Sequence, residues 1–186
     1  MSKVLVPLAP GFEDLEAVTI VDLLRRAGIE VVTAGLAPGL VQGARGTRMQ
    51  PDATLDAVLD QAFDMIALPG GMPGAENLKR DARVQALLKK MAAAGKYTAA
   101  ICAAPIALAE AGLLNGKKAT SYPGFLDKLN LPATTCLNDA VVVDGRVVTS
   151  RGPGTALDFA LELIALLQGE TKRDQVEAGL VRPDPR

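Results

Sequence analysis

Cys102 lies where a short apolar strand, residues 97–101, is predicted to give way to a helix over residues 104–111. A thiol at this junction faces the positive end of the helix dipole, which favours the thiolate over the thiol. Because the thiolate is the reactive form, Cys102 is a candidate nucleophile. The alternative is a cysteine buried as a small hydrophobic residue. The alanines that flank Cys102 leave room for a tight turn and favour the nucleophile.

The chain contains no histidine, and this absence limits the chemistry available to Cys102. A Cys–His pair and a Ser–His–Asp triad are both excluded within one chain. Histidine is also the commonest zinc ligand, and the two cysteines of the sequence cannot by themselves complete a tetrahedral zinc site. We therefore expect no bound metal. Acid–base chemistry must therefore use a carboxylate, a tyrosine, a lysine or water.

Three acidic residues, Glu13, Asp14 and Glu16, stand at the start of a helix predicted over residues 13–26. Acidic side chains favour this end of a helix dipole, and we interpret Glu13 and Asp14 in that way. Glu16 precedes Ile20 by one helical turn, so it can reach the buried edge of the helix. A partly buried carboxylic acid that stays neutral can donate a hydrogen bond to a thiolate, whereas an ionised one would oppose it.

Two glycines, Gly70 and Gly71, follow an apolar strand predicted over residues 65–68. Their backbone N–H groups could line a concavity that stabilises an oxyanion, or they could only make a tight turn. A phosphate-binding loop is disfavoured because no Lys-Ser or Lys-Thr follows. The similar segment at residues 150–155 is interpreted as the turn before a long helix, and Cys136 as a structural thiol.

Strands and helices alternate along the chain, which predicts an α/β fold with a mainly parallel sheet between two layers of helices. The dipeptide Asp144-Gly145 separates two strands and predicts a small β-hairpin. Strands are expected at residues 3–8, 29–34, 65–68, 97–101, 140–143 and 146–149, and helices at 13–26, 82–94, 104–111, 155–168 and 171–180. Ligands of such sheets bind beyond the carboxyl ends of the strands, where residues 9–14, residues 69–74 and Cys102 would meet.

The length of 186 residues and the lack of a linker predict a single domain, 1–186, with a mobile charged tail at residues 182–186. Hydrophobic residues make up 49% and charged residues 22% of the chain, which excludes disorder. The 20 basic and 21 acidic residues give a net charge of -1, so neither nucleic acid nor a membrane is an expected partner. No export signal or membrane-spanning run is recognised, so we expect a cytoplasmic protein.

The order and spacing of four short segments resemble those of a known protein family. They are GFEDLEA at residues 11–17, LPGG at 68–71, AAICAAP at 99–105 and TSRGPGT at 149–155. Together they resemble the ThiJ/PfpI superfamily and, within it, the clade of the Parkinson disease protein deglycase (DJ-one), over nearly the whole chain. The resemblance implies a flavodoxin-like three-layer sandwich, a homodimer, and no metal or organic cofactor.

The resemblance also implies roles for individual residues. Cys102 corresponds to the reactive cysteine on a nucleophile elbow, and Glu16 to the glutamate that partners it. Gly71 corresponds to the glycine whose N–H lines the cysteine pocket, and Ala103 to the residue that supplies a second N–H.

Three further positions match residues near that pocket. Arg26 and Arg45 correspond to arginines that lie near the pocket and the dimer interface in relatives. Tyr122 stands where the deglycase has a histidine, within the segment 120–123. A phenol is a poor base at neutral pH, although it can orient a substrate. This departure disfavours the peptidase and amidotransferase branches, which use a Cys–His pair.

The resemblance implies an enzyme that acts on methylglyoxal-type dicarbonyls or on their adducts, glycated amines and thiols. Cys102 would add to an aldehyde carbon, and the product would be a hydroxy acid such as lactate. N–H groups around Gly71 and Ala103 would stabilise the oxygen anion, while Glu16 would move a proton between neighbouring carbon and oxygen atoms. An alternative is a redox-responsive sensor or chaperone in which Cys102 becomes a sulfinate. Hydration of an isocyanide is a third hypothesis, which no residue of the sequence distinguishes.

Overall fold

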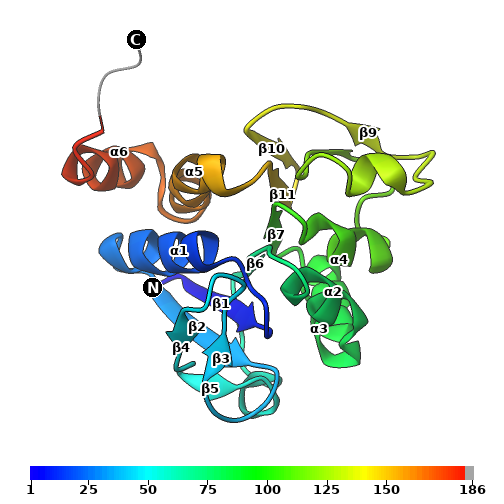
Figure 1. Ribbon diagram of the computed structural model, residues 1–186. Helices are drawn as coiled ribbons and strands as arrows, with labels where there is room; N and C mark the ends of the chain where they lie inside the picture. The colour runs from blue at the N-terminus through cyan, green and yellow to red at the C-terminus, as the bar shows by residue number, and fades with distance from the viewer. Residues whose placement is uncertain (183–186) are drawn as a thin grey trace.

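A seven-stranded sheet forms the centre of the protein, seen in a computed structural model that describes residues 1–182 (Figure 1). Its strands follow the order β10 (Val141–Asp144), β11 (Val147–Ser150), β7 (Tyr97–Ile101), β6 (Met65–Leu68), β1 (Lys3–Leu8), β2 (Glu30–Gly35) and β5 (Ala53–Thr54). Neighbouring strands are parallel except β10 and β11, which form the predicted antiparallel hairpin. The order β2-β1-β6-β7-β11 reverses beside β1, which is the flavodoxin-like arrangement that the sequence predicts.

Helices cover both faces of the sheet and make three layers (Figure 1). One layer contains α1 (Asp14–Arg26), α5 (Ala156–Gln168) and α6 (Glu170–Gly179), with α5 packed against both neighbours. The other layer contains α2 (Gly74–Arg80), α3 (Ala82–Ala93) and α4 (Pro105–Glu110). Because both faces are covered, β6 is buried along its whole length and β1 is buried from Val4 onward.

Short elements that the sequence does not predict surround this core. The strand β3 (Val41–Gln42) pairs with β4 (Arg48–Met49), and β8 (Lys118–Ala119) pairs with β9 (Thr135–Cys136). Short 3-10 helices stand at η1 (Asp56–Val58), η2 (Leu126–Lys128) and η3 (Pro153–Thr155). Elements of two or three residues are too short to show a periodic pattern of hydrophobic residues, so the sequence pattern does not predict them.

The hairpin turn lies one residue later than predicted. Asp144 pairs with Val147 at the end of β10, so the turn consists of residues 145–146 rather than 144–145. The Asp144 carboxylate accepts a hydrogen bond from the Lys118 N–H at 2.9 Å. This contact with β8 helps to keep Asp144 within the strand.

The ends of the predicted helices also shift by a residue. α1 begins at Asp14, and Glu13, predicted to be its first residue, takes the N-cap position. None of the helices within residues 1–182 is both long enough and apolar enough to cross a membrane. Of the tail predicted to be mobile, residues 182–186, only Arg182 lies within the described residues, where it pairs with Asp158 at 2.8 Å.

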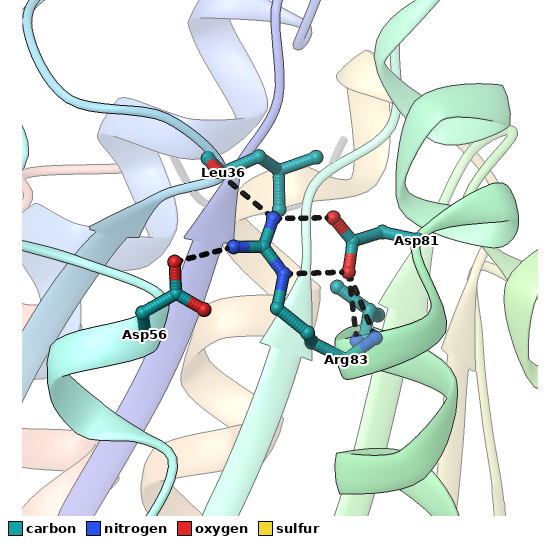
Figure 2. Close-up of polar contacts among 5 residues, drawn as sticks. Leu36, Asp56, Asp81 and Arg83 are labelled. Atoms are coloured by element: carbon teal, nitrogen blue, oxygen red, sulfur yellow. Dashed lines mark hydrogen bonds and ion pairs between the residues drawn. The ribbon is translucent and has the colours of Figure 1, made fainter.

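An arginine in the first turn of α3 ties three segments together (Figure 2). The Arg83 guanidinium contacts Asp81 through Nη2 at 2.6 Å and through Nε at 3.1 Å. It also donates to Asp56 in η1 at 2.8 Å and to the Leu36 carbonyl, just after β2, at 2.9 Å. Asp81 caps α3 by accepting the N–H groups of Arg83 and Val84. The cluster therefore fastens α3 to the carboxyl edge of the sheet.

Removal of the Asp81 carboxylate should eliminate the N-terminal cap of α3 and the hydrogen bonds that Asp81 accepts from the Arg83 guanidinium. We expect Asp81→Ala to lower the free energy of unfolding by about 1 to 3 kcal/mol, and Asp81→Asn, which keeps a capping oxygen, to lower it less. Hydrogen bonds from Arg83 hold the pKa of Asp81 below its usual value. The stabilisation is therefore present at neutral pH and is lost as the pH falls through that lowered pKa.

Urea unfolding of these variants at neutral and at acid pH measures both effects. Asp60→Ala, at an exposed acid outside the cluster, is the matched control. Equal losses of stability in Asp81→Ala and Asp60→Ala would contradict the role of the cluster.

Candidate active site

Cys102 follows the last residue of β7 and adopts a backbone conformation that few non-glycine residues take. Its φ angle is 64°, which lies in the left-handed region. The Cys102 N–H donates to the Ser150 carbonyl at the end of β11 at 3.0 Å. The Cys102 carbonyl accepts the Tyr122 N–H at 2.8 Å. These two bonds hold the turn in its strained conformation, a frequent property of functional sites.

Glu16 lies in the first turn of α1 and is fully buried, with an exposed fraction of 0%. Its Oε2 accepts the Gly70 N–H at 2.8 Å, and its carboxyl lies beside the Cys102 thiol. Its Oε1 has no hydrogen-bond partner among the residues that the structure describes. The carboxyl therefore retains an oxygen that can exchange a proton with the thiol.

Gly70 permits this approach because it carries no side chain. A Cβ at Gly70 would lie 2.7 Å from the Cβ of Cys102 and 2.8 Å from Glu16 Oε2. Gly71 has a φ angle of 88°, and a Cβ there would lie 2.3 Å from the Glu13 nitrogen. The Glu13 N–H donates to the Gly70 carbonyl at 2.8 Å, which fixes the glycine loop to the start of α1. Gly70 is thus required by close packing against Cys102 and Glu16, and Gly71 by close packing against the backbone before α1.

The two acidic groups of the site perturb each other. Burial raises the pKa of Glu16 to about 7, although hydrogen bonds from Gly70 and Cys102 act in the opposite direction. Burial also raises the pKa of Cys102 to about 12, and the neighbouring Glu16 charge adds to that rise. The N–H groups of Gly71 and Ala103 lower the pKa of Cys102 by less than burial and Glu16 raise it.

The expected preference for a thiolate at the helix start is therefore wrong when Glu16 is ionised. The helix α4 has only six residues and begins at Pro105, beyond the turn that holds the sulfur. An ionised Glu16 keeps the proton on the Cys102 sulfur, whereas a protonated Glu16 removes the repulsion. The two groups lie close enough to titrate as a coupled pair, in which a proton lost by the sulfur can pass to the carboxylate.

A cavity of about 370 Å³ has the thiol in its wall. It brings together the following residues singled out in the sequence: Cys102, Ala103, Gly71, Tyr122 and Arg45. Glu16 is not among the lining residues, because it reaches the thiol from the buried side. The cavity lies where β6 and β7 end, at the edge at which sheets of this topology bind ligands.

Tyr122 is half-exposed in the cavity wall. Its ring packs edge-to-face on Phe125, with ring centroids 6.2 Å apart. Its backbone N–H, rather than its hydroxyl, holds the carbonyl of Cys102. Tyr122 thus shapes the wall and supports the turn that carries the nucleophile.

The two arginines singled out in the sequence lie in different places. The Arg45 guanidinium is 3.8 Å from Glu13 in the cavity wall, and the Arg45 N–H donates to Asp14 at 2.8 Å. Arg26 ends α1, is exposed, pairs with Asp22 at 2.9 Å and does not line the cavity. A role for Arg26 in a dimer interface remains a prediction.

Sequence reasoning missed further residues of the wall: Glu13, Ala44, Met72, Phe125 and Pro153. Glu13 is predicted only to complement the helix dipole, but its side chain makes no capping hydrogen bond and lines the cavity instead. The signal that could have found it is its position between the end of β1 and α1, within one of the loops expected at the site. Asp14 holds the adjacent loop by accepting the N–H groups of Arg45 and Thr47.

The remaining segments singled out in the sequence lie around the site. A hydrogen bond of 2.7 Å links the hydroxyls of Ser150 and Thr155 in the turn before α5. Residues 150–155 therefore form the turn that the sequence predicts before a long helix. Cys136 is exposed, so its interpretation as a structural thiol is wrong, because β9 belongs to a small sheet outside the core. Within residues 1–182, no group of three His, Cys, Asp or Glu side chains is placed to hold a metal ion.

Replacement of Glu16 by glutamine removes the charge that helps to raise the pKa of Cys102. We expect the Cys102 thiolate of Glu16→Gln to form at lower pH, so that alkylation by iodoacetamide shifts down by about 1 pH unit or more. Peptide mass spectrometry separates Cys102 from the exposed Cys136, whose profile is the internal control. An unchanged profile at Cys102 would show that the Glu16 charge does not control the thiol.

The comparisons with known proteins agree with this architecture. A sequence model described as the DJ-1/PfpI family matches residues 2–166. "Protein DJ-1 homolog A" of Arabidopsis thaliana is 45% identical over 185 residues, which cover 98% of this chain and 47% of that protein. The chain spans about half the length of the Arabidopsis relatives that it matches.

Two further relatives match over most of their own length. "Glutathione-independent glyoxalase DJR-1.2" of Caenorhabditis elegans is 36% identical over 164 residues, 88% of this chain and 87% of that protein. The solved structure "Toxoplasma gondii DJ-1, oxidized" is 43% identical, covers 97% of this chain and 98% of its own, and superposes with a TM-score of 0.93. From the matched motifs, the fold and these identities, the chain belongs to the DJ-1/PfpI family.

Proposed function

We propose that this chain is a cysteine-dependent enzyme that converts methylglyoxal-type dicarbonyls to hydroxy acids without histidine, metal or organic cofactor. The observation that carries the proposal is the Cys102 thiol, which has the buried Glu16 carboxyl on one side and an open cavity on the other. The relative named as a glutathione-independent glyoxalase, 36% identical to this chain, supports the same chemistry.

The first step is addition of the Cys102 sulfur to the aldehyde carbon of the dicarbonyl. Glu16 accepts the thiol proton as the carbon–sulfur bond forms, and a base whose pKa is about 7 suits this task at neutral pH. The N–H groups of Gly71 and Ala103 stabilise the negative charge that develops on the aldehyde oxygen. Return of the proton from Glu16 to that oxygen gives a neutral hemithioacetal.

The second step converts the hemithioacetal to a hydroxyacyl thioester by moving hydrogen from the former aldehyde carbon to its neighbour. Water then hydrolyses the thioester, releases the hydroxy acid and restores the Cys102 thiol. The balance for methylglyoxal is one dicarbonyl plus one water to one lactate, so no oxidant or reductant is consumed. The same steps release an amine or a thiol when the dicarbonyl has first reacted with one.

Production of lactate from methylglyoxal tests this proposal. We expect the wild type to form lactate, and both Cys102→Ser and Glu16→Gln to lose at least about 100-fold in kcat, because each lacks a reacting group. Val143→Ala, at an exposed edge-strand position away from the cavity, is the matched control and should keep the wild-type rate.

A second function is supported by the relative whose solved structure is described as oxidized. Peroxide would convert the Cys102 thiolate to a sulfenate and a second peroxide would give the sulfinate, with the same N–H groups stabilising the charge. Lactate formation no greater than in Cys102→Ser, together with rapid sulfinate formation at Cys102, would overturn the enzyme proposal in favour of a redox sensor.

We further propose that the chain works as a homodimer through the outer face of α1. Leu15 and Val18 on this helix are 51% and 47% exposed, although most large apolar side chains of α1 are buried. A second copy that covers this face would remove both side chains from water. It would also bring Arg26, on the same helix, to the interface.

The dimer proposal predicts that Leu15→Glu makes the protein monomeric, because a charge would then be buried between the copies. Light scattering after gel filtration measures the mass of each variant. Val143→Glu, on the distant edge strand β10, should leave the mass of the wild type unchanged. A monomeric wild type would contradict the proposal.

A further inference from the structure

We propose that Glu13 is a catalytic residue, the acid–base group that moves the proton between the two carbon atoms of the substrate. This assignment rests on the proposed conversion of dicarbonyls and gives that reaction its second carboxylate. It also differs from the sequence-based expectation, in which Glu16 performs this transfer.

Glu16 is poorly placed for the transfer between carbon atoms. It is fully buried and does not line the cavity in which a dicarbonyl would bind. One of its oxygens is held by the Gly70 N–H, and the carboxyl lies against the Cys102 thiol. Glu16 can therefore exchange a proton with the sulfur and with the adduct oxygen beside it, but the carbon atoms of a bound adduct lie on the cavity side.

Glu13, unlike Glu16, lies in the wall of the cavity. Its side chain is only 12% exposed and lines the cavity together with Cys102 and Gly71. The Glu13 N–H is bonded to the Gly70 carbonyl at 2.8 Å, so its backbone is fixed beside the loop that holds the oxyanion. The carboxyl makes no capping bond to α1, which leaves it available for another task.

Among residues 1–182, no other group in the cavity wall can act as this base. The titratable side chains that line the cavity are Glu13, Arg45, Cys102 and Tyr122. The sulfur of Cys102 is bonded to the substrate at this stage, while a guanidinium and a phenol keep their protons at neutral pH. The chain has no histidine that could substitute. A carboxylate is an established type of base for a proton next to a carbonyl group.

The Arg45 guanidinium lies beside the Glu13 carboxylate without immobilising it. The two side chains are 3.8 Å apart, and Arg45 is 75% exposed, so solvent weakens their attraction. No hydrogen bond joins the Glu13 carboxylate to another side chain within residues 1–182. Its oxygens are therefore free to accept a proton from a substrate.

The transfer balances without an external reagent. The Glu13 carboxylate removes the proton from the carbon bonded to sulfur, and the electron pair of that C–H bond forms an enediolate with the neighbouring carbonyl. The hydroxyl proton on the first carbon then passes to the second oxygen, since the N–H groups of Gly71 and Ala103 favour charge on the first. Glu13 returns its proton to the second carbon, which completes the hydroxyacyl thioester.

The test compares Glu13→Gln with the wild type on methylglyoxal carrying deuterium on the aldehyde carbon. We expect kcat for lactate to fall by at least about 100-fold, whereas the pH profile of Cys102 alkylation should shift much less than in Glu16→Gln, because the Glu13 charge is only a minor influence on Glu16. Deuterium should appear on the second carbon of lactate from the wild type, because Glu13 carries the label across. Glu13→Asp, which keeps an acid, should restore part of the rate and of the label transfer.

Glu76→Gln, on α2 and outside the cavity, is the matched control for loss of an acid and should behave as the wild type. A wild-type rate and label transfer in Glu13→Gln would overturn the assignment of Glu13 alone. No lactate from the wild type would overturn the proposed function as well. If Glu13→Gln does not fold, Glu13→Asp decides: a rate and label transfer equal to those of the wild type would overturn the assignment, and a partial loss of both would support it.

Discussion

The absence of a side chain at Gly70 allows a thiol and a carboxyl to meet inside the protein. A Cβ at this position would lie within 2.8 Å of both Cys102 and Glu16, so any larger residue would separate the pair. The approach also requires α1, β6 and β7 to pack in their observed places, because each carries one member of the contact. Burial then favours the neutral form of Glu16, which the Gly70 N–H only partly offsets.

Two carboxylates one helical turn apart approach the nucleophile from different environments. Glu16 is enclosed by the core and interacts with sulfur, while Glu13 stands at the cap of α1 and lines the open cavity. Similar side chains acquire different chemistry when one is enclosed beside a thiol and the other faces an open cavity. A chain without histidine can therefore divide proton transfer between two acids of one sequence motif.

Much of the arrangement follows from patterns that a single sequence contains. Buried strands that alternate with amphipathic helices predict the parallel sheet, and a parallel sheet brings the loops after β1, β6 and β7 to one edge. For this reason the sequence alone predicts that Gly71 and Cys102 lie close together. The strong signal of the Asp-Gly dipeptide likewise predicts the hairpin, with an error of one residue.

Other properties depend on distances and burial that no local pattern encodes. The pKa of Cys102 is set by burial and by the Glu16 charge, which outweigh the helix dipole that the sequence suggests. The direction of the Glu13 side chain depends on the glycine loop packed against its backbone. The sequence also does not show which of Arg26 and Arg45 lies at the cavity. Only Arg45 does, because its loop is held beside α1 by a hydrogen bond to Asp14.

The chemical modification of the two thiols, Cys102 and Cys136, can measure local unfolding of the segments that enclose Cys102. Cys136 is exposed in a peripheral strand, whereas Cys102 is 8% exposed and bonded to segments from two other parts of the chain. A reagent too large for the cavity would reach Cys102 only when β7, β11 or the segment around Tyr122 separates. The ratio of the two modification rates would then report the free energy of that opening, independent of reagent concentration. Such a reporter has practical value in a chain that has no tryptophan.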